Sequence, residues 1–221
     1  MRLHGLCYYR GNSETWTTKF RKEDWAARNL VKAIKHEDFK GYSDIKTGNS
    51  TIRIDNTVSG RNRALNAVAG ALANKISQAG YQNAAVIPIP SSSHVNPNAV
   101  FTGRRIAEAI RAKNGAFVST PVLYFDEPLQ KSAGGGGTRN AGAIQAHLRL
   151  ANCQLPPSVV LLDDVCTTGG HLKAAARFLA EHGVEVQDAF VIGRTVWEQP
   201  DNMFAVQTEE MQTTSLFDFD F

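Results

Sequence analysis

The sequence predicts an α/β protein organised around a parallel β-sheet. Short runs of consecutive apolar residues alternate along the chain with stretches in which apolar residues recur at helical spacing. Polar residues do not interrupt the apolar runs, which is typical of strands covered on both faces by helices. The chain has 221 residues, of which 43% are hydrophobic, so it is long enough for one sizeable core and too short for two full catalytic domains.

Composition and charge exclude several classes of protein. Lys and Arg number 24 against 21 Asp and Glu, and a formal net charge of +3 gives no support for a nucleic-acid partner. The three cysteines form no CxxC pair, which argues against a disulfide framework or a zinc site and favours a reducing compartment. No apolar run approaches the ~20 residues of a membrane span, and the N-terminus lacks a signal-peptide pattern. We therefore expect a cytoplasmic protein without membrane contact.

The N-terminal part of the chain is predicted to contain one helix between less regular segments. Residues 1–20 alternate weakly and are rich in aromatic side chains, which indicates a short strand or a loop. A helix follows from Asp24, which we expect to cap its start. Its apolar residues share one face, at Ala27, Leu30, Val31 and Ile34. The segment 41–60 is polar and turn-like, with a candidate short strand at 51–54.

The middle of the chain alternates helices with strands. A second amphipathic helix is predicted at 61–78 and ends at Gly80. Its buried stripe consists of Leu65, Val68, Leu72 and Ile76. The apolar run 84–90 predicts a strand, which leads into the polar loop 91–98. A third helix is predicted at 99–113, and its inward-facing residues are Ile106 and Ile110.

The second half of the chain continues the same alternation. Residues 118–125 contain another strand, whereas 126–142 include four consecutive glycines and are predicted to form a mobile loop. A continuous apolar strand at 159–162 precedes a helix and a final strand at 185–192. That helix has Leu172, Ala176 and Leu179 on its apolar face and stops at Gly183. The tail 208–221 is acidic and aromatic, and we expect it to lie outside the main sheet.

The turn after the strand at 159–162 is the most informative part of the sequence. Asp163 and Asp164 stand at the carboxyl end of the strand, where α/β sheets bind their ligands. The residues that open the next helix are Thr167, Thr168, Gly169 and Gly170. Backbone N–H groups at such a helix start favour a phosphate, and two carboxylates suit ribose hydroxyls or a bridging Mg²⁺. A sugar 5-phosphate satisfies both halves; the alternative is that the acids merely end the strand and cap the helix.

Residues 159–171 resemble the PRPP-binding motif of the type I phosphoribosyltransferases, in which four apolar residues precede two acids and a Thr-Gly phosphate loop (PRPP is 5-phosphoribosyl 1-pyrophosphate). The resemblance implies a Rossmann-like phosphoribosyltransferase fold with an N-terminal extension, and Mg²⁺ as the cofactor. Asp163 and Asp164 would act as catalytic residues that hold the ribose hydroxyls, and either one would be a candidate contact for Mg²⁺. The 5-phosphate would be bound by Thr167, Thr168, Gly169, Gly170 and His171.

Two positions depart from the family pattern. His171 stands where the family usually has Thr or Ser, so an imidazole replaces a hydroxyl donor. Thr167 stands where members that salvage 6-oxopurines carry an acid, which argues against hypoxanthine or guanine as the base. Among the subfamilies, the chain resembles the ComF-like one (competence protein F and its relatives) over most of residues 25–195.

The same resemblance implies three segments and a pyrophosphate loop. Residues 1–60 would form an extension or hood, 61–195 the phosphoribosyltransferase core, and 196–221 a C-terminal segment. The pyrophosphate would be held by Ser91, Ser92 and Ser93. Arg104 or Arg105, at the start of the next helix, would assist. The alternative is an ordinary loop between a strand and a helix.

Other implied contacts lie in the loop and tail regions. Lys131 and Arg139 would belong to a loop that closes over the ligand and holds the pyrophosphate leaving group; the alternative is a surface linker. Arg194 and Trp197, after the last strand, would meet the nucleobase, with the indole stacking on it; the alternative for tryptophan is burial in the core. The tail 208–221 either docks into a partner protein or packs on its own domain.

Two functional hypotheses follow. The first is an enzyme that transfers phosphoribose from Mg-PRPP to a nitrogen base or another nucleophile and releases pyrophosphate. The second is a non-catalytic PRPP-binding regulator, or an accessory factor in DNA uptake and processing. The sequence leaves open the acceptor and whether the chain forms a homodimer.

Overall fold

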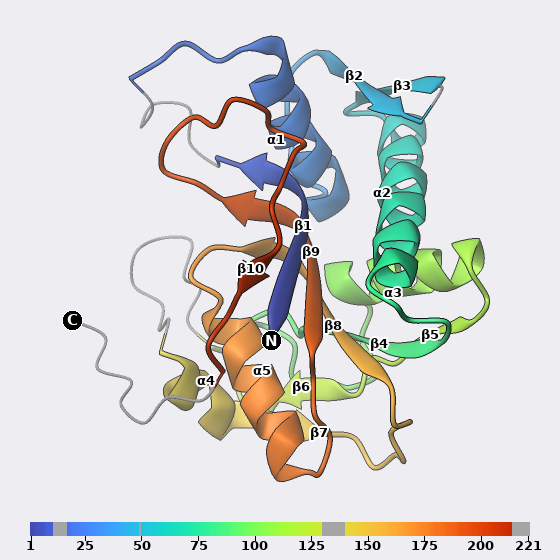
Figure 1. Cartoon of the computed structure of the whole chain (residues 1–221), viewed down its shortest axis with the longest axis vertical. Coiled ribbons are helices and arrows are strands. Elements are labelled where there is room, and N and C mark those ends of the chain that lie inside the picture. The colour runs from blue at the N-terminus through green and yellow to red at the C-terminus, as the bar shows by residue number, and fades with distance from the viewer. Residues whose placement is uncertain (11–16, 49, 130–139, 214–221) are drawn as a thin grey trace.

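A six-stranded sheet forms the centre of the protein (Figure 1). The computed structural model describes residues 1–10, 17–48, 50–129 and 140–213. In spatial order the strands are β10 (Glu209–Glu210), β1 (Arg2–Tyr9), β9 (Asp188–Thr195), β8 (Val159–Cys166), β4 (Ala84–Pro88) and β5 (Phe117–Ser119). Neighbouring strands run parallel except β10, which is antiparallel to β1. The predicted α/β class with a parallel sheet is confirmed.

Helices cover both faces of the sheet (Figure 1). One face packs against α1 (Lys22–Lys35), α2 (Val58–Gln78) and α3 (Thr102–Lys113), and the other against α4 (Ala141–His147) and α5 (Gly170–Glu181). Strand β8 serves both cores because successive side chains of a strand point to opposite faces. Val160 and Leu162 join the first core, whereas Val159 and Leu161 join the second. This double burial explains its uninterrupted apolar sequence.

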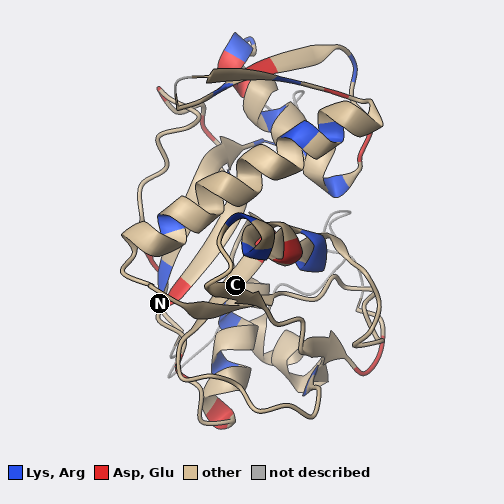
Figure 2. Ribbon diagram, turned by 90° about the vertical axis from the view of Figure 1, so that its right-hand side faces the viewer, with Lys and Arg blue, Asp and Glu red and all other residues tan. Residues whose placement is uncertain are grey.

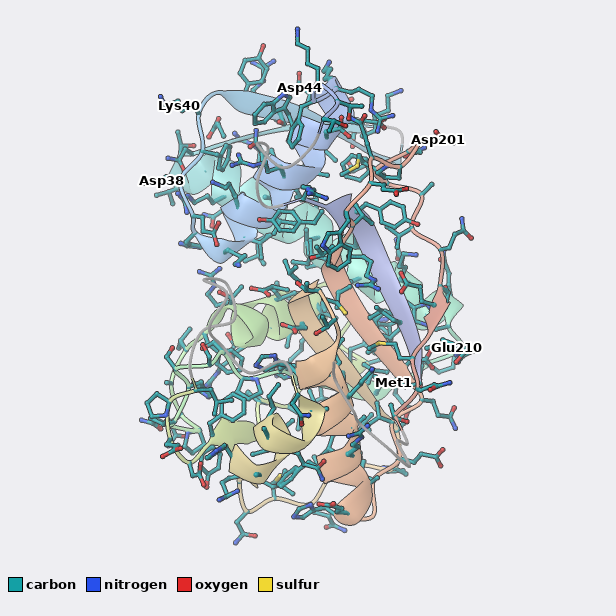
Figure 3. The ribbon with its side chains drawn as sticks, turned by 90° about the vertical axis from the view of Figure 1, so that its left-hand side faces the viewer. Met1, Asp38, Lys40, Asp44, Asp201 and Glu210 are labelled. Atoms are coloured by element: carbon teal, nitrogen blue, oxygen red, sulfur yellow. The ribbon has the colours of Figure 1, made fainter. Side chains whose placement is uncertain are left out.

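Two small antiparallel pairs flank the main sheet. The hairpin of β2 (Tyr42–Thr47) and β3 (Ser50–Asp55) lies beside α1 and the start of α2, and it includes the strand expected at 51–54 (Figure 1). Figure 3 labels Asp38, Lys40 and Asp44 in this part of the molecule. The second pair joins β6 (Leu123–Phe125) to β7 (Leu148–Leu150) on the α5 side. The β2–β3 hairpin packs on α1, and both lie in the upper part of the view in Figure 1.

The expected limits of the sheet are wrong at both ends. Strand β1 was expected to belong to an extension, yet it lies inside the sheet, where Cys7 pairs with Gly193 of β9. Residues Leu3, Cys7 and Tyr9 of β1 are buried, so the weak alternation at the N-terminus reflects a strand with covered faces. Strand β10 adds part of the tail to the sheet edge, and Figure 3 shows Glu210 beside Met1 there. Residues 214–221 of the predicted tail lie outside the described residues.

Several element boundaries also differ from the sequence prediction. Helix α1 begins at Lys22 and not after Asp24. Asp24 lies in its first turn, where its side chain accepts a hydrogen bond from the backbone N–H of Arg21 at 2.5 Å. Helix α4 starts within the segment predicted as a loop, with the Asn140 side chain accepting the N–H of Ala143. The last long strand begins at Asp188, three residues later than predicted. None of the described helices is long and apolar enough to cross a membrane.

Charged side chains are mixed over the surface. In the view of Figure 2, Lys and Arg occur on helices in both halves of the molecule, with Asp and Glu among them. This distribution fits the small formal net charge of +3.

Candidate functional site

A cavity of about 630 Å³ opens at the carboxyl ends of β4 and β8. Its walls are formed by 89–93 after β4, by 163–172 from the end of β8 into α5, by Thr102 of α3, and by Lys35 and Glu37 at and just after the end of α1. Parallel strands place their carboxyl ends at one edge, and this is where α/β sheets bind ligands. The structure therefore brings the predicted acid-and-glycine turn and the predicted serine loop to one cavity.

The turn between β8 and α5 presents a helix N-terminus to the cavity. Gly169, the residue before α5, has a φ of 81° and no side chain to cap the helix. The first N–H groups of a helix have no partner within it, and its dipole favours negative charge there. Gly170 and His171 of this first turn line the cavity together with Thr167 and Thr168. The arrangement suits a phosphate group.

The two aspartates stand beside this turn. Both are partly buried and line the cavity, and the N–H of Asp164 donates to Oδ1 of Asp163 at 2.8 Å. Burial raises the pKa of Asp163 well above its usual range, and the neighbouring charge of Asp164 adds to this. Burial also raises the pKa of Asp164, although the charge of Lys35 opposes it. Hydrogen bonds from hydroxyl groups, or a bound divalent cation, stabilise the charged form of such buried carboxylates. The pair therefore fits ribose hydroxyls or Mg²⁺.

Lys35 and Glu37 form the wall that the sequence prediction did not assign to the site. Lys35 Nζ lies 3.1 Å from Glu37 Oε1. Burial lowers the pKa of Lys35, but the charges of Asp164 and Glu37 outweigh it and raise the pKa overall, so Lys35 stays protonated. Lys32, one turn earlier, instead donates to the carbonyl of Asp38. The packing of α1 against the sheet places Lys35 at the cavity.

The serine loop lines the cavity with Ser91, Ser92 and Ser93. Its backbone is held by the His94 N–H, which donates to the Ser91 carbonyl at 2.8 Å, and by the Leu129 N–H, which donates to the Ser92 carbonyl at 2.7 Å. Oxygen-rich turns of this kind offer hydroxyl and N–H donors to an anion.

The two arginines expected to assist the serine loop are directed elsewhere. Arg104 donates to Glu108 Oε1 at 2.9 Å, and Arg105 donates to the carbonyl of Ile34 at 2.7 Å. Arg104 also donates to the carbonyl of Asn98 at 3.0 Å. Neither arginine lines the cavity, so the structure does not bring them to the serine loop as expected. From α3, Thr102 lines the cavity instead.

The remaining predicted residues have different surroundings. Lys131 and Arg139 lie outside the described residues. Trp197 is 61% exposed, so it is not buried in the core, which was the alternative to base stacking. It does not line the cavity. Burial lowers the pKa of His171, so the imidazole is neutral near pH 7 and offers one N–H donor to the cavity.

Cys166 and Arg194 lie under the turn. Burial raises the pKa of the Cys166 thiol to about 12, which rules out a thiolate nucleophile near neutral pH. Arg194 was expected to follow the last strand and face the base. It belongs to β9, and its guanidinium donates to the backbone carbonyls of Cys166 and Thr167.

No protein-family model matches the chain, and no curated protein matches it. Among solved structures, the chain is similar to the APRTase from Giardia lamblia complexed with 9-deazaadenine, with 16% identity and a TM-score of 0.43 over 69% of this chain and 93% of that one. It is also similar to adenine phosphoribosyl transferase from Trypanosoma brucei in complex with AMP, pyrophosphate and ribose-5-phosphate, with 12% identity and a TM-score of 0.40 over 79% and 83%.

A third similar structure is adenine phosphoribosyltransferase from Thermoanaerobacter pseudethanolicus, with 16% identity and a TM-score of 0.40 over 70% of this chain and 95% of that one.

Proposed function

We propose that the cavity binds Mg-PRPP and that the chain is a phosphoribosyltransferase-like protein of the type I kind, with the ComF-like subfamily as its relatives. One observation carries the proposal. Two partly buried acids and an uncapped, glycine-started helix share one cavity at the carboxyl ends of parallel strands. An anion site directly beside two acids fits a ligand that is a phosphate at one end and a polyol next to it.

In this proposal Asp163 and Asp164 accept hydrogen bonds from the ribose hydroxyls and hold the sugar ring in place. The N–H groups and hydroxyls of the turn 167–170 bind the 5-phosphate, and the neutral His171 ring contributes a further N–H. Holding the ribose from both ends fixes the position of its C1 carbon. The energetic benefit is mainly orientation, which replaces a bimolecular encounter by a positioned one.

The leaving group would lie between the serine loop and Lys35. A nitrogen lone pair of the acceptor forms a bond to C1 while the bond from C1 to the pyrophosphate oxygen breaks, and its electrons leave with pyrophosphate. Ser91, Ser92 and Ser93 would donate to the pyrophosphate, and the protonated Lys35 would offset its negative charge. Bound Mg²⁺ would supply further positive charge on the pyrophosphate, with Asp163 or Asp164 as its protein contact.

Further positive charge is proposed from Lys131 and Arg139. We also propose that α1 and the β2–β3 hairpin act as the hood, because α1 carries Lys35 to the cavity. Trp197 keeps its proposed role of stacking on the acceptor base, which its exposure permits.

The second candidate is a PRPP-binding regulator or accessory factor of DNA uptake and processing that performs no transfer. The observation that favours it is His171, an imidazole at the position where the resembling family usually has Thr or Ser. Binding without turnover distinguishes this candidate from the enzyme.

Calorimetry with Mg²⁺ and PRPP tests the proposal, followed by pyrophosphate release across a panel of bases. We expect saturable binding that is lost in Asp163→Asn/Asp164→Asn and retained in Asp201→Asn, whose exposed carboxylate lies outside the cavity. Pyrophosphate release with one of the bases supports the enzyme, and binding without release on any base supports the regulator. A wild-type chain with no affinity for PRPP or ribose 5-phosphate contradicts both.

A further inference from the structure

Arg194 of β9 connects the phosphate-type turn to the C-terminal edge of the sheet. Its Nη1 donates to the carbonyl oxygen of Cys166 at 3.3 Å and to the carbonyl oxygen of Thr167. Its Nε donates to both carboxylate oxygens of Glu209 in β10, at 2.9 and 3.0 Å. The side chain is 21% exposed, so solvent screens these bonds only in part.

The two bonded carbonyls belong to the same peptide units as two N–H groups of the turn. The carbonyl of Cys166 shares its peptide plane with the N–H of Thr167, and the carbonyl of Thr167 shares its plane with the N–H of Thr168. In a trans peptide the C=O and N–H point in opposite directions. Both carbonyls are drawn toward Arg194 on the β9 side, so the two N–H groups point the other way. Thr167 and Thr168 both line the cavity, so N–H groups directed away from β9 are placed to meet a ligand there.

Two further contacts support the turn. Thr167 Oγ1 lies 3.1 Å from Thr195 Oγ1 of β9. Met211 packs on the turn so closely that a Cβ added to Gly169 would lie 2.1 Å from its Cε. Glu209 and Met211 both come from the C-terminal segment, and Glu209 offsets the charge of Arg194. Arg194 therefore acts through the direction of its hydrogen bonds rather than through excess positive charge.

We propose that Arg194 is a positioning residue that aims the N–H groups of Thr167 and Thr168 at the ligand phosphate. The inference rests on the proposed function for the identity of that ligand, a sugar 5-phosphate. Successive N–H groups that converge on one point form an anion-binding concavity, and their alignment before binding reduces the cost of ordering the turn. Arg194 does not touch the ligand in this role.

The test combines N–H orientation with ligand affinity in the full chain. Residual dipolar couplings of the ¹⁵N-labelled protein without ligand report the direction of each backbone N–H. In Arg194→Met we expect altered couplings at Thr167 and Thr168. We also expect affinity for ribose 5-phosphate to fall about tenfold or more, the size of one charge-assisted hydrogen bond, and affinity for inorganic pyrophosphate to change less than about twofold. Arg194→Lys should restore part of the affinity, because an ammonium group still donates to carbonyls.

The controls separate positioning from general loosening. Arg177→Met is the matched control, because Arg177 Nε donates to the carbonyl of Thr213 and thus contacts the C-terminal segment elsewhere. We expect it to leave the couplings at Thr167 and Thr168 and the ribose 5-phosphate affinity unchanged. Arg194→Met also leaves Glu209 without its partner, so Arg194→Met/Glu209→Gln provides a second variant if the single one does not fold.

Unchanged couplings at Thr167 and Thr168 in these Arg194 variants would overturn the inference, and so would altered couplings with unchanged ribose 5-phosphate affinity. Equal weakening of ribose 5-phosphate and pyrophosphate would also overturn it, since the loss would then be general. Altered couplings in a chain whose wild type binds no sugar phosphate would support the positioning of the N–H groups and contradict the proposed function instead.

Discussion

Gly169 is the position where one methyl group tests the architecture of the turn most sharply. Its φ of 81° lies in the left-handed region, where a residue with a Cβ costs about 1–2 kcal/mol. A Cβ there would also lie 2.1 Å from Met211 Cε, and overpacking costs about 1–3 kcal/mol. The Met211 methyl ends a flexible side chain, which limits this second cost. We therefore expect Gly169→Ala to lower the free energy of unfolding by about 2–4 kcal/mol.

Two other glycines separate the two costs. Gly183 has a φ of 78° with nothing within 4 Å of an added Cβ, so Gly183→Ala should cost about 1–2 kcal/mol for the backbone alone. Gly115 has open space and no left-handed φ, so Gly115→Ala should change stability by less than about 0.5 kcal/mol. Chemical denaturation measures all three. In Gly169→Ala/Met211→Ala the excess cost over Gly183→Ala should largely disappear.

Equal stability losses in Gly169→Ala and Gly183→Ala would refute the close packing of Met211 on the turn. A loss in Gly169→Ala no larger than that in Gly115→Ala would refute the left-handed conformation as well. Because the turn is also the proposed phosphate site, Gly169→Ala should weaken ribose 5-phosphate binding, whereas Gly183→Ala should not.

Three further predictions concern the cavity and the tail. Lys35→Met should weaken PRPP binding about tenfold in calorimetry, and Lys32→Met, one turn away, much less; equal effects would contradict the role of Lys35. Burial and the adjacent acid raise the pKa of Asp163, so the folded chain holds more protons than the unfolded chain and loses stability as pH rises above the usual carboxyl pKa. The thermal stability of Asp163→Asn relative to wild type should therefore increase as the pH rises from about 4 to about 8. A stability difference that stays constant over this range would contradict the raised pKa. Deleting 208–221 removes β10 and Met211 and should lower the thermal midpoint; an unchanged midpoint would contradict the packing of β10.

The sequence predicted those elements whose signal is local. Strand β8 is a continuous apolar run because both of its faces are buried, and the stripes of α2 and α3 repeat at helical spacing. Strand β1 was not assigned to the sheet because its partner β9 lies far along the chain and its alternation is compatible with a loop. Strand β10 is shorter still and is defined by its pairing to β1 rather than by its own residues.

In the candidate site, too, the residues with a local sequence signal were predicted, and those placed by contacts between distant segments were not. The acids and the glycine turn are contiguous in sequence, so their chemistry was readable before their positions were known. Lys35 reaches the cavity because α1 packs over the sheet, and Arg194 reaches the turn because β9 lies beside β8. The arginines at the start of α3 were misassigned because charge alone does not show direction: Arg104 pairs with Glu108, and Arg105 with the carbonyl of Ile34.

The central claim is that one ligand is held by the acids at its sugar and by the turn at its phosphate. A crystal structure of the chain with Mg²⁺ and PRPP tests this most directly. We expect the 5-phosphate against residues 167–170 and the ribose hydroxyls within hydrogen-bond distance of Asp163 and Asp164. A ligand bound with its phosphate elsewhere, or an empty cavity at saturating PRPP, would contradict the claim.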